Sequence, residues 1–409
     1  GLDPLIHVLE RRGYTVIAPR GRTGTVVLAE VHGADELPGG VGDEQGPGRY
    51  RLVARTDGRV FAQAAAPTAA KPVFFPADEL IWRGRRSGSQ FDVTDAGDEP
   101  ARPVAVIGLR ACDLAALAQH DHVLGGRGFP DTRYVRRRAG AFLVAVACAE
   151  PAGTCFCVST GGSPRPASGY DLVLTELAPG PDGAGGPHRF VAEVGTDLGA
   201  EVLAELPTQP ATATDLAAVD AQVADASARM GRVMDTADLR DLLYASAESP
   251  LWDDVGSRCL ACMNCTMVCP TCFCTTVADV SVLGSDDAER RRVWDSCFSE
   301  EFAHIHGGSL RTETRSRYRQ WLTHKLAAWT DQFGSIGCVG CGRCITWCPV
   351  GIDLTEEGAA QRAAARLPAG VGGAAWTMQS VQVTSEAHEK LRVNQSASCE
   401  PTMLKVCRT

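Results

Sequence analysis

The sequence lacks several patterns that would place it in a common functional class. No run of eighteen or more apolar residues occurs, and residues 1–25 mix charged side chains with short apolar pieces, so we expect neither a membrane-spanning helix nor a secretory signal. Basic residues are not in excess, because 40 lysines and arginines against 49 acidic residues give a net charge of -9. This balance argues against a nucleic-acid-binding protein. The glycine groups near residues 125 and 180 match neither the dinucleotide-binding pattern nor the P-loop, so the sequence offers no nucleotide site.

Cysteine, in contrast, is abundant, with 17 in a chain of 409 residues. A disulfide scaffold is typical of short secreted chains, whereas this chain is long enough for two or three domains. Most of its cysteines also follow the spacing of metal ligands. We therefore expect a protein of the reducing cytoplasm.

Two stretches repeat one cysteine pattern, C-x2-C-x2-C-x3-C-P, from Cys259 to Pro270 and from Cys338 to Pro349. In bacterial two-cluster ferredoxins, three close cysteines of such a run bind one 4Fe-4S cluster and the fourth crosses to the other. Zinc is the competing metal, but zinc sites typically use two separated pairs of ligands. The pattern therefore predicts two 4Fe-4S clusters. If the fourth ligands exchange, cluster 1 is bound by Cys259, Cys262, Cys265 and Cys348, and cluster 2 by Cys338, Cys341, Cys344 and Cys269.

Four further cysteines, Cys112, Cys148, Cys155 and Cys157, lie in the N-terminal part of the chain. Cys112 and Cys148 each follow an expected strand, at the edge where α/β folds build their sites. Their spacing matches no standard cluster run, so two interpretations remain open. The four thiols either bind a third iron-sulfur cluster, with Asp113 as a substitute ligand, or act as small buried hydrophobic residues.

The remaining five cysteines complete the count of 17. We expect them to pack near a cluster rather than to bind it, because the eight ligands of the two runs are already complete. They are Cys272, Cys274, Cys297, Cys399 and Cys407.

Basic side chains gather between the two runs, at Arg311, Arg315, Arg317, Arg319 and Lys325. Such a group usually forms a solvated helix face. The alternatives are a docking surface or compensation of the negative charge of a cluster.

The N-terminal part alternates apolar runs rich in β-branched residues with glycine- and proline-rich breaks, which predicts strands. We expect strands at Thr15–Ala18, Val26–Val31, Tyr50–Ala54, Val104–Leu109, Ala141–Ala147 and Leu172–Leu177. Helical patterns occur at Asp113–Leu124, with Asp113 as N-cap, and then at Thr214–Val233, Thr236–Glu248, Asp286–Phe302, Arg311–Trp329 and Leu354–Leu367.

These patterns predict an α+β protein in three parts. Residues 1–211 are expected to form a mixed α/β domain, with or without its own iron-sulfur cluster. Residues 212–367 are expected to form an α-helical ferredoxin domain with the two 4Fe-4S clusters, and residues 368–409 a C-terminal tail.

Five segments of this chain resemble a known family, the dicluster beta subunits of cytoplasmic NAD(P)-linked nickel-iron hydrogenases. These sulfhydrogenase beta subunits are close relatives of the A subunit of anaerobic sulfite reductase. The similarity runs from about residue 70 to about residue 367, and the cluster runs with Cys-Pro-Thr-Cys-Phe-Cys between them are its most specific part. The segments are Ile107–Leu114, Thr154–Cys157, Arg258–Cys274, Val293–Phe298 and Gly337–Asp353.

The resemblance implies an electron-transfer subunit that works beside three partners: a flavin and NAD(P)-binding subunit, a nickel-iron subunit, and a small iron-sulfur subunit. It also favours the third cluster, because the family places cysteines where Cys112, Cys148, Cys155 and Cys157 stand. The chain departs from the family at Ala111, where proline is common, and after residue 368, where nothing matches. The alternative functions are that of the A subunit of anaerobic sulfite reductase and, in a different class, that of an iron-sulfur regulatory or interaction protein.

Overall fold

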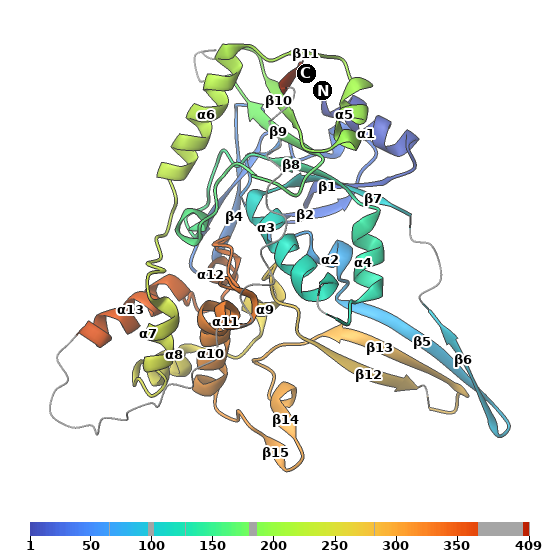
Figure 1. Cartoon of the computed structure of the whole chain (residues 1–409), viewed down its shortest axis with the longest axis vertical. Helices are drawn as coiled ribbons and strands as arrows, with labels where there is room; N and C mark the ends of the chain where they lie inside the picture. Colours follow the sequence, from blue (N-terminus) through green and yellow to red (C-terminus); the bar gives the residue numbers. More distant parts are fainter. Residues whose placement is uncertain are drawn as a thin grey trace, which may run out of the picture.

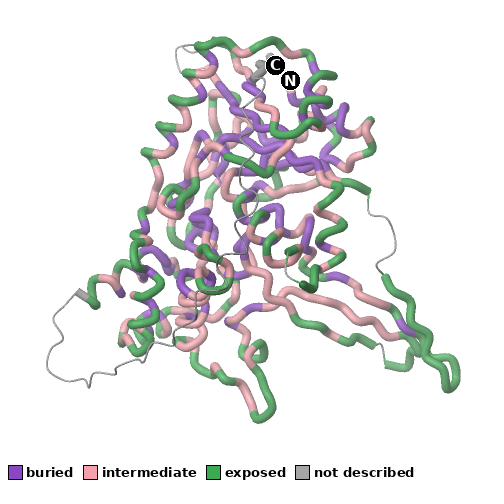
Figure 2. The backbone as a smooth tube through the Cα atoms, in the orientation of Figure 1, coloured by how far each residue is buried: buried purple, intermediate pink, exposed green. Residues whose placement is uncertain are grey.

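A computed structural model describes residues 1–64, 66–96, 102–126, 128–179, 186–281, 283–366 and 404–408. Figure 1 shows a large sheet in the upper half, a group of short helices at the lower left, and a second sheet that projects at the lower right. Buried residues concentrate in the large sheet and in the helical group, as Figure 2 shows. In the described part of the chain, no helix has the length and apolar character needed to cross a membrane.

The large sheet has eight strands in the order β11-β16-β10-β9-β8-β7-β1-β2. Its four central strands, β9, β8, β7 and β1, run parallel, and the strands on either side pair antiparallel. The strands are β1 (Thr15–Arg22), β2 (Thr25–Glu30), β7 (Val104–Leu109), β8 (Phe142–Val146), β9 (Leu172–Leu177), β10 (Arg189–Val194), β11 (Thr208–Pro210) and β16 (Leu404–Arg408). All of the strands expected in this region are confirmed, including β4 (Arg49–Ala54), which pairs with β3 (Val41–Gly46) in a separate hairpin.

The parallel strands are apolar on both faces, because successive residues of a strand point to opposite sides. Each face is buried against its own set of helices. Ile107, Val144 and Leu172 belong to one core, together with Leu5 and Leu9 of helix α1. The helices of this core are α1 (Leu2–Arg11) and α5 (Asp197–Ala204).

The alternate residues of the same strands, such as Val106 and Leu143, join a core on the other face. That core includes Phe74, Leu117 and Tyr134, one residue from each of the three helices that cover this face. They are α2 (Lys71–Phe74), α3 (Ala111–His120) and α4 (Thr132–Ala139). Helix α6 (Ala213–Ala228) packs Val219 beside Leu177 and Val191 and confirms the helix expected there.

The helix expected at Asp286–Phe302 is wrong. Residues Asp287–Trp294 form strand β13, which pairs with β12 (Thr275–Ser281) and with β5 (Asp78–Ser87). With β6 (Gln90–Asp95) they make the projecting four-stranded sheet of Figure 1. The arginines that suggested a helix pair across the strands instead, Arg290 with Asp279 and Arg291 with Asp78. Because β5 and β6 come from the N-terminal part, this sheet crosses the expected domain boundary at residue 211.

The helical group encloses the two cysteine runs. Its core contains Trp252, Phe298, Trp321, Leu322 and Ile345. The helices expected at Arg311–Trp329 and Leu354–Leu367 are confirmed, the first as α10 and α11 with a π-helical turn, η5 (His324–Ala328), between them. The helices of the group are α7 (Leu239–Ala245), α8 (Leu251–Arg258), α9 (Asn264–Met267), α10 (Thr314–Thr323), α11 (Trp329–Phe333), α12 (Arg343–Thr346) and α13 (Leu354–Arg366).

Most of the expected tail, residues 368–403 and 409, lies outside the described residues, as does residue 367. Residues 404–408 form strand β16, which pairs with β10 on one side and β11 on the other. The small hairpin of β14 (His304–Ile305) and β15 (Gly308–Ser309) follows a 3₁₀ turn at Glu301–Ala303.

Candidate metal centres

The two cysteine runs have the same backbone conformation. Ala261 and Met263 of the first run are left-handed, with φ of 50° and 68°, and the equivalent Gly340 and Gly342 of the second have φ of 64° and 71°. Each run then enters a short helix, α9 or α12, five residues after its first cysteine. Left-handed residues cost a non-glycine side chain about 1–3 kcal/mol. The first run therefore stores strain at Ala261 and Met263 in order to curve its three cysteines around one centre.

The predicted ligands of cluster 1 lie around one cavity. Cys259, Cys262 and Cys265 line it together with Cys348, the fourth cysteine of the other run. The cavity is otherwise walled mainly by apolar side chains, among them Phe298. The structure thus brings together the crossed set of cysteines that the sequence predicts.

The predicted ligands of cluster 2 also converge. Cys344 is close enough for electrostatic interaction with Cys338, Cys341 and Cys269. Burial raises the pKa of Cys338 to about 12 and raises the pKa of Cys344 well above its usual range. Iron binds the thiolate form, so loading of this site releases protons.

The four N-terminal cysteines meet at the carboxyl ends of the parallel strands. Cys112 begins α3 after β7, Cys148 follows β8, and Cys155 and Cys157 lie on the next loop. All four line one cavity. Burial raises the pKa of each thiol, that of Cys157 to about 11. The interpretation as scattered hydrophobic residues is therefore weakened, because the four cysteines surround a common space.

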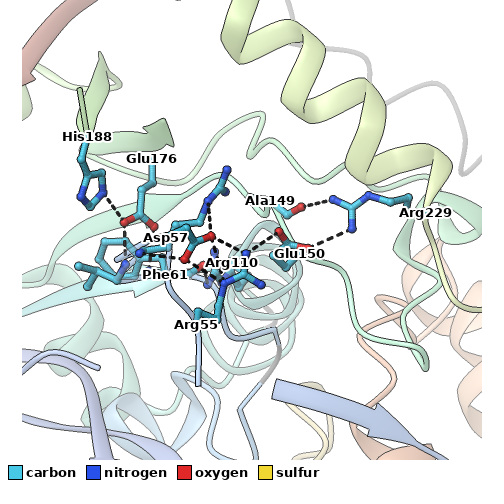
Figure 3. A network of polar contacts seen from close by, with 11 residues as sticks. Arg55, Asp57, Phe61, Arg110, Ala149, Glu150, Glu176, His188 and Arg229 are labelled. Carbon is cyan, nitrogen blue, oxygen red and sulfur yellow. Dashed lines mark hydrogen bonds and ion pairs between the residues drawn. The ribbon is translucent and has the colours of Figure 1, made fainter. Parts of the chain in front are cut away.

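A polar network fixes the residues beside these cysteines, as Figure 3 shows. Arg110, two residues before Cys112, donates to the carbonyl oxygens of Phe61 and Gln63 at 2.8 and 2.6 Å. Arg229 donates to the Ala149 carbonyl oxygen at 2.7 Å, next to Cys148. The buried Glu176 accepts from the backbone N–H groups of Val60 and Phe61. These contacts hold the loops that carry the cysteines in place.

The third cysteine group and the second run touch through their backbones. The N–H of Phe156 donates to the carbonyl oxygen of Gly340 at 2.8 Å, and the Cys155 thiol donates to that of Cys341 at 3.8 Å. A Cβ on Gly340 would lie 2.5 Å from Cys157 Cα, so only glycine permits this approach. The two centres are therefore neighbours, joined by direct contact.

Asp113 is not the expected N-cap of helix α3, although its side chain takes part in a capping box. The N-cap is Arg110, and Asp113 occupies the third helical position, where it accepts from the Arg110 backbone N–H at 3.0 Å. Its other oxygen accepts from Arg343 at 2.8 Å. Both carboxylate oxygens are thus engaged, which argues against Asp113 as a substitute ligand.

The additional cysteines near the runs pack beside the proposed ligands. The Cys272 thiol donates a hydrogen bond to the sulfur of Cys269, a contact that lowers the pKa of Cys269. Cys274 and Cys297 lie close to one another and are half-buried. Cys399 lies outside the described residues, and of Cys407 only the backbone is described.

Two cations are buried at the second centre: Lys325, which belongs to the basic group for which compensation of a cluster's charge was an alternative, and Arg343, which the sequence did not single out. Arg315 and Arg319 pair with exposed acids, as expected for a solvated face, but Lys325 is buried against Cys269. Arg343, between Cys341 and Cys344, is buried as well. The signal for Lys325 is its helical spacing from Trp321 and Leu322, four and three residues earlier, which places it on the apolar side.

Thiolate is the ligand that iron-sulfur clusters require, and each run presents its thiols on a curved loop. None of the fifteen cysteines whose side chains are described forms a disulfide. The residues of the two runs therefore fit two clusters, and those of the N-terminal group fit a third.

Similarity to known proteins supports the interpretation of the two cysteine runs as 4Fe-4S sites. Residues 258–352 match the family described as 4Fe-4S dicluster domain. Sulfhydrogenase 2 subunit beta of Pyrococcus furiosus is 32% identical over 251 residues, which are 61% of this chain and 71% of that protein. No solved structure matches the chain. The chain is therefore an iron-sulfur protein with two 4Fe-4S clusters, and it belongs to the family of sulfhydrogenase beta subunits.

Proposed function

We propose that this chain is the electron-transfer subunit of a multisubunit cytoplasmic nickel-iron hydrogenase linked to NAD(P). It relays single electrons between a flavin and NAD(P)H-binding subunit on one side and, on the other, a nickel-iron large subunit with its small iron-sulfur subunit. The observation that carries the proposal is the contact between three cysteine groups within one chain. The name of the Pyrococcus furiosus relative, a sulfhydrogenase subunit, supports the choice of complex.

In this function the protein holds the clusters in position and shields them from solvent. When bound, 4Fe-4S clusters supply one-electron transfer. Cys259, Cys262, Cys265 and Cys348 would hold cluster 1, Cys338, Cys341, Cys344 and Cys269 cluster 2, and Cys112, Cys148, Cys155 and Cys157 a third cluster.

The order of the centres follows from shared residues. Cys344, a proposed ligand of cluster 2, also lines the cavity of cluster 1. Gly340 and Cys341 line the cavity of the third group. Cluster 2 therefore lies between the other two, and a relay through the chain would pass through it.

Cluster 1 is the end that a partner can reach. Cys262 is exposed, and Leu260, two residues before it in the run, is 63% exposed. Val350, which lines the same cavity, is 43% exposed. An exposed apolar rim around a redox centre suits the docking of another subunit.

The isolated chain is expected to exchange electrons with artificial dyes but to oxidise no hydrogen. The sequence has no flavin, nickel or nucleotide motif, so hydrogen activation is expected from a partner subunit. Dye reduction and hydrogen uptake, measured anaerobically on the purified chain and on the reassembled complex, test this. Hydrogen uptake by the single chain would overturn the proposal.

Iron quantitation is expected to give about twelve irons per chain, because three cubanes hold about four irons each. Cys112→Ser is then expected to reduce the count by about four. The control is Val158→Ala, at an exposed position beside Cys157, which should leave the count unchanged. A wild-type count of about eight, with no loss in Cys112→Ser, would end the proposal of a third cluster but leave the two-cluster relay intact.

A further inference from the structure

Lys325 has the contacts of a fully charged ammonium in the protein interior. Lys325 is only 5% exposed. Nζ donates to Cys269 Sγ at 3.3 Å, to Thr271 Oγ1 at 2.9 Å and to the Gly337 carbonyl oxygen at 2.9 Å. An ammonium has three donors and no acceptor, so these three acceptors use all of its protons.

No carboxylate balances this charge. Within the described part of the chain, Lys325 forms no ion pair with Asp or Glu, and the groups that act on its charge most strongly are Cys269, Cys272 and Cys338. Lys71, another buried cation, carries the same charge and therefore repels Lys325. A buried charge without a partner is strongly destabilising. The partner of Lys325 is therefore the sulfur-rich centre itself.

We propose that Lys325 is a positioning residue that raises the reduction potential of cluster 2, the cluster assigned to Cys338, Cys341, Cys344 and Cys269. Reduction adds a negative charge to a cluster, so a fixed cation at a ligand sulfur stabilises the reduced form more than the oxidised form. Hydrogen bonds to sulfur and net charge are among the factors that set cluster potentials. The proposal rests on the ligand assignment given under Proposed function.

The effect should single out cluster 2. The cavity of cluster 1 has no lysine or arginine in its lining, and its ligand Cys262 is exposed to water. The third group has Arg110 in its wall, but this arginine donates to two backbone carbonyl oxygens rather than to a ligand sulfur.

Arg343 differs from Lys325 at the same centre. It also donates to a proposed ligand, Cys341, but Asp113 lies 2.8 Å from its guanidinium and neutralises its charge. Among the described residues, Lys325 is thus the cation that donates a hydrogen bond to a proposed ligand sulfur and has no carboxylate partner of its own.

Lys71 provides a matched control. It is 4% exposed, but its ammonium lies 3.6 Å above the ring of Trp294 and donates to the carbonyl oxygens of Cys272 and Met267 at 3.2 and 3.4 Å. Lys71→Met therefore removes a buried lysine next to the same centre without removing a bond to a ligand sulfur.

The test is a redox titration followed by electron paramagnetic resonance on the full chain, with iron quantified in every sample. Lys325→Met and Lys325→Gln are expected to retain the wild-type iron content and to lower the midpoint potential of one cluster while the others stay unchanged. Lys325→Arg, which keeps the charge, should return the potential toward that of the wild type. Lys71→Met should give a smaller shift than Lys325→Met.

Three results would overturn the proposal. The first is unchanged potentials in Lys325→Met at full iron content. The second is an equal shift in all clusters, or a shift in Lys71→Met as large as that in Lys325→Met. The third is a loss of about four irons in both neutral variants, which would show that the lysine holds the cluster rather than tunes it. A wild-type chain with fewer than two clusters would instead contradict the cofactor content on which the proposed function depends.

Discussion

Cys344→Ser is expected to remove about four irons per chain, the content of one cubane, and to abolish electron transfer between the two ends of the protein. Cys344 lies near the ligands of both clusters, since it interacts with Cys338, Cys341 and Cys269 and also with Cys265. Serine offers a harder oxygen ligand in place of the thiolate that iron-sulfur clusters require. In the proposed relay cluster 2 is the middle centre, so its loss would interrupt the path along the chain.

The same substitution should also reduce stability. Cys344, Cys338 and Cys348 pack against the apolar core that contains Trp321 and Ile345. Without its cluster this core has a hole lined by thiols, and a cavity costs about 24 cal/mol per Å³. Iron content, dye-to-dye electron transfer and the thermal midpoint, all measured anaerobically, check these expectations together.

Cys297→Ser is the matched control for this experiment. Cys297 is half-buried beside the same core and close to Cys265, but it belongs to neither proposed ligand set. The variant is expected to keep the full iron content and near-normal electron transfer. A loss of about four irons in Cys297→Ser, with retention in Cys344→Ser, would show that the ligand sets are wrongly assigned.

The central strands of the large sheet and the cysteine runs could be predicted because their signals are local. The strands β7 and β8 are continuous apolar runs, and β9 begins with one, which is typical of strands buried on both faces. The cysteine spacing also predicts the shape of the loops, because the left-handed positions, Gly340 and Gly342 in the second run, lie within the motif itself.

Strand β13 could not be predicted, because its sequence favours a helix and only its partners make it a strand. Arg292 pairs with Glu79 of β5, more than 200 residues earlier in the chain. Tertiary pairing of this kind overrides local propensity. The burial of Arg343 could not be predicted for the same reason, since it is stabilised by Asp113 from a distant segment.

Arg343→Met is expected to lower the free energy of unfolding by about 3–5 kcal/mol, the usual cost of removing one partner from a buried ion pair. The Arg343 side chain is 2% exposed and that of Asp113 is 6% exposed, and the two are 2.8 Å apart. Arg343 also donates to the Ala66 carbonyl oxygen at 2.6 Å. The pair joins helix α12 of the second run to helix α3, which carries Cys112, so its loss should also loosen the contact between cluster 2 and the third group.

A double-mutant cycle separates the ion pair from these other contacts. Asp113→Asn removes the charge but keeps an oxygen that can accept from the Arg110 backbone N–H. If the buried pair carries the cost, Arg343→Met combined with Asp113→Asn should be less destabilised than the sum of the single variants, by about 0.5–3 kcal/mol. The exposed pair Arg315 and Asp253, 2.9 Å apart, serves as the control, because surface pairs contribute only about 0–1 kcal/mol. Urea unfolding at equal iron content measures each free energy. If Arg343→Met costs no more than Arg315→Met, the pair does not join the two centres energetically, and their other contacts, such as that of Phe156 with Gly340, hold them together.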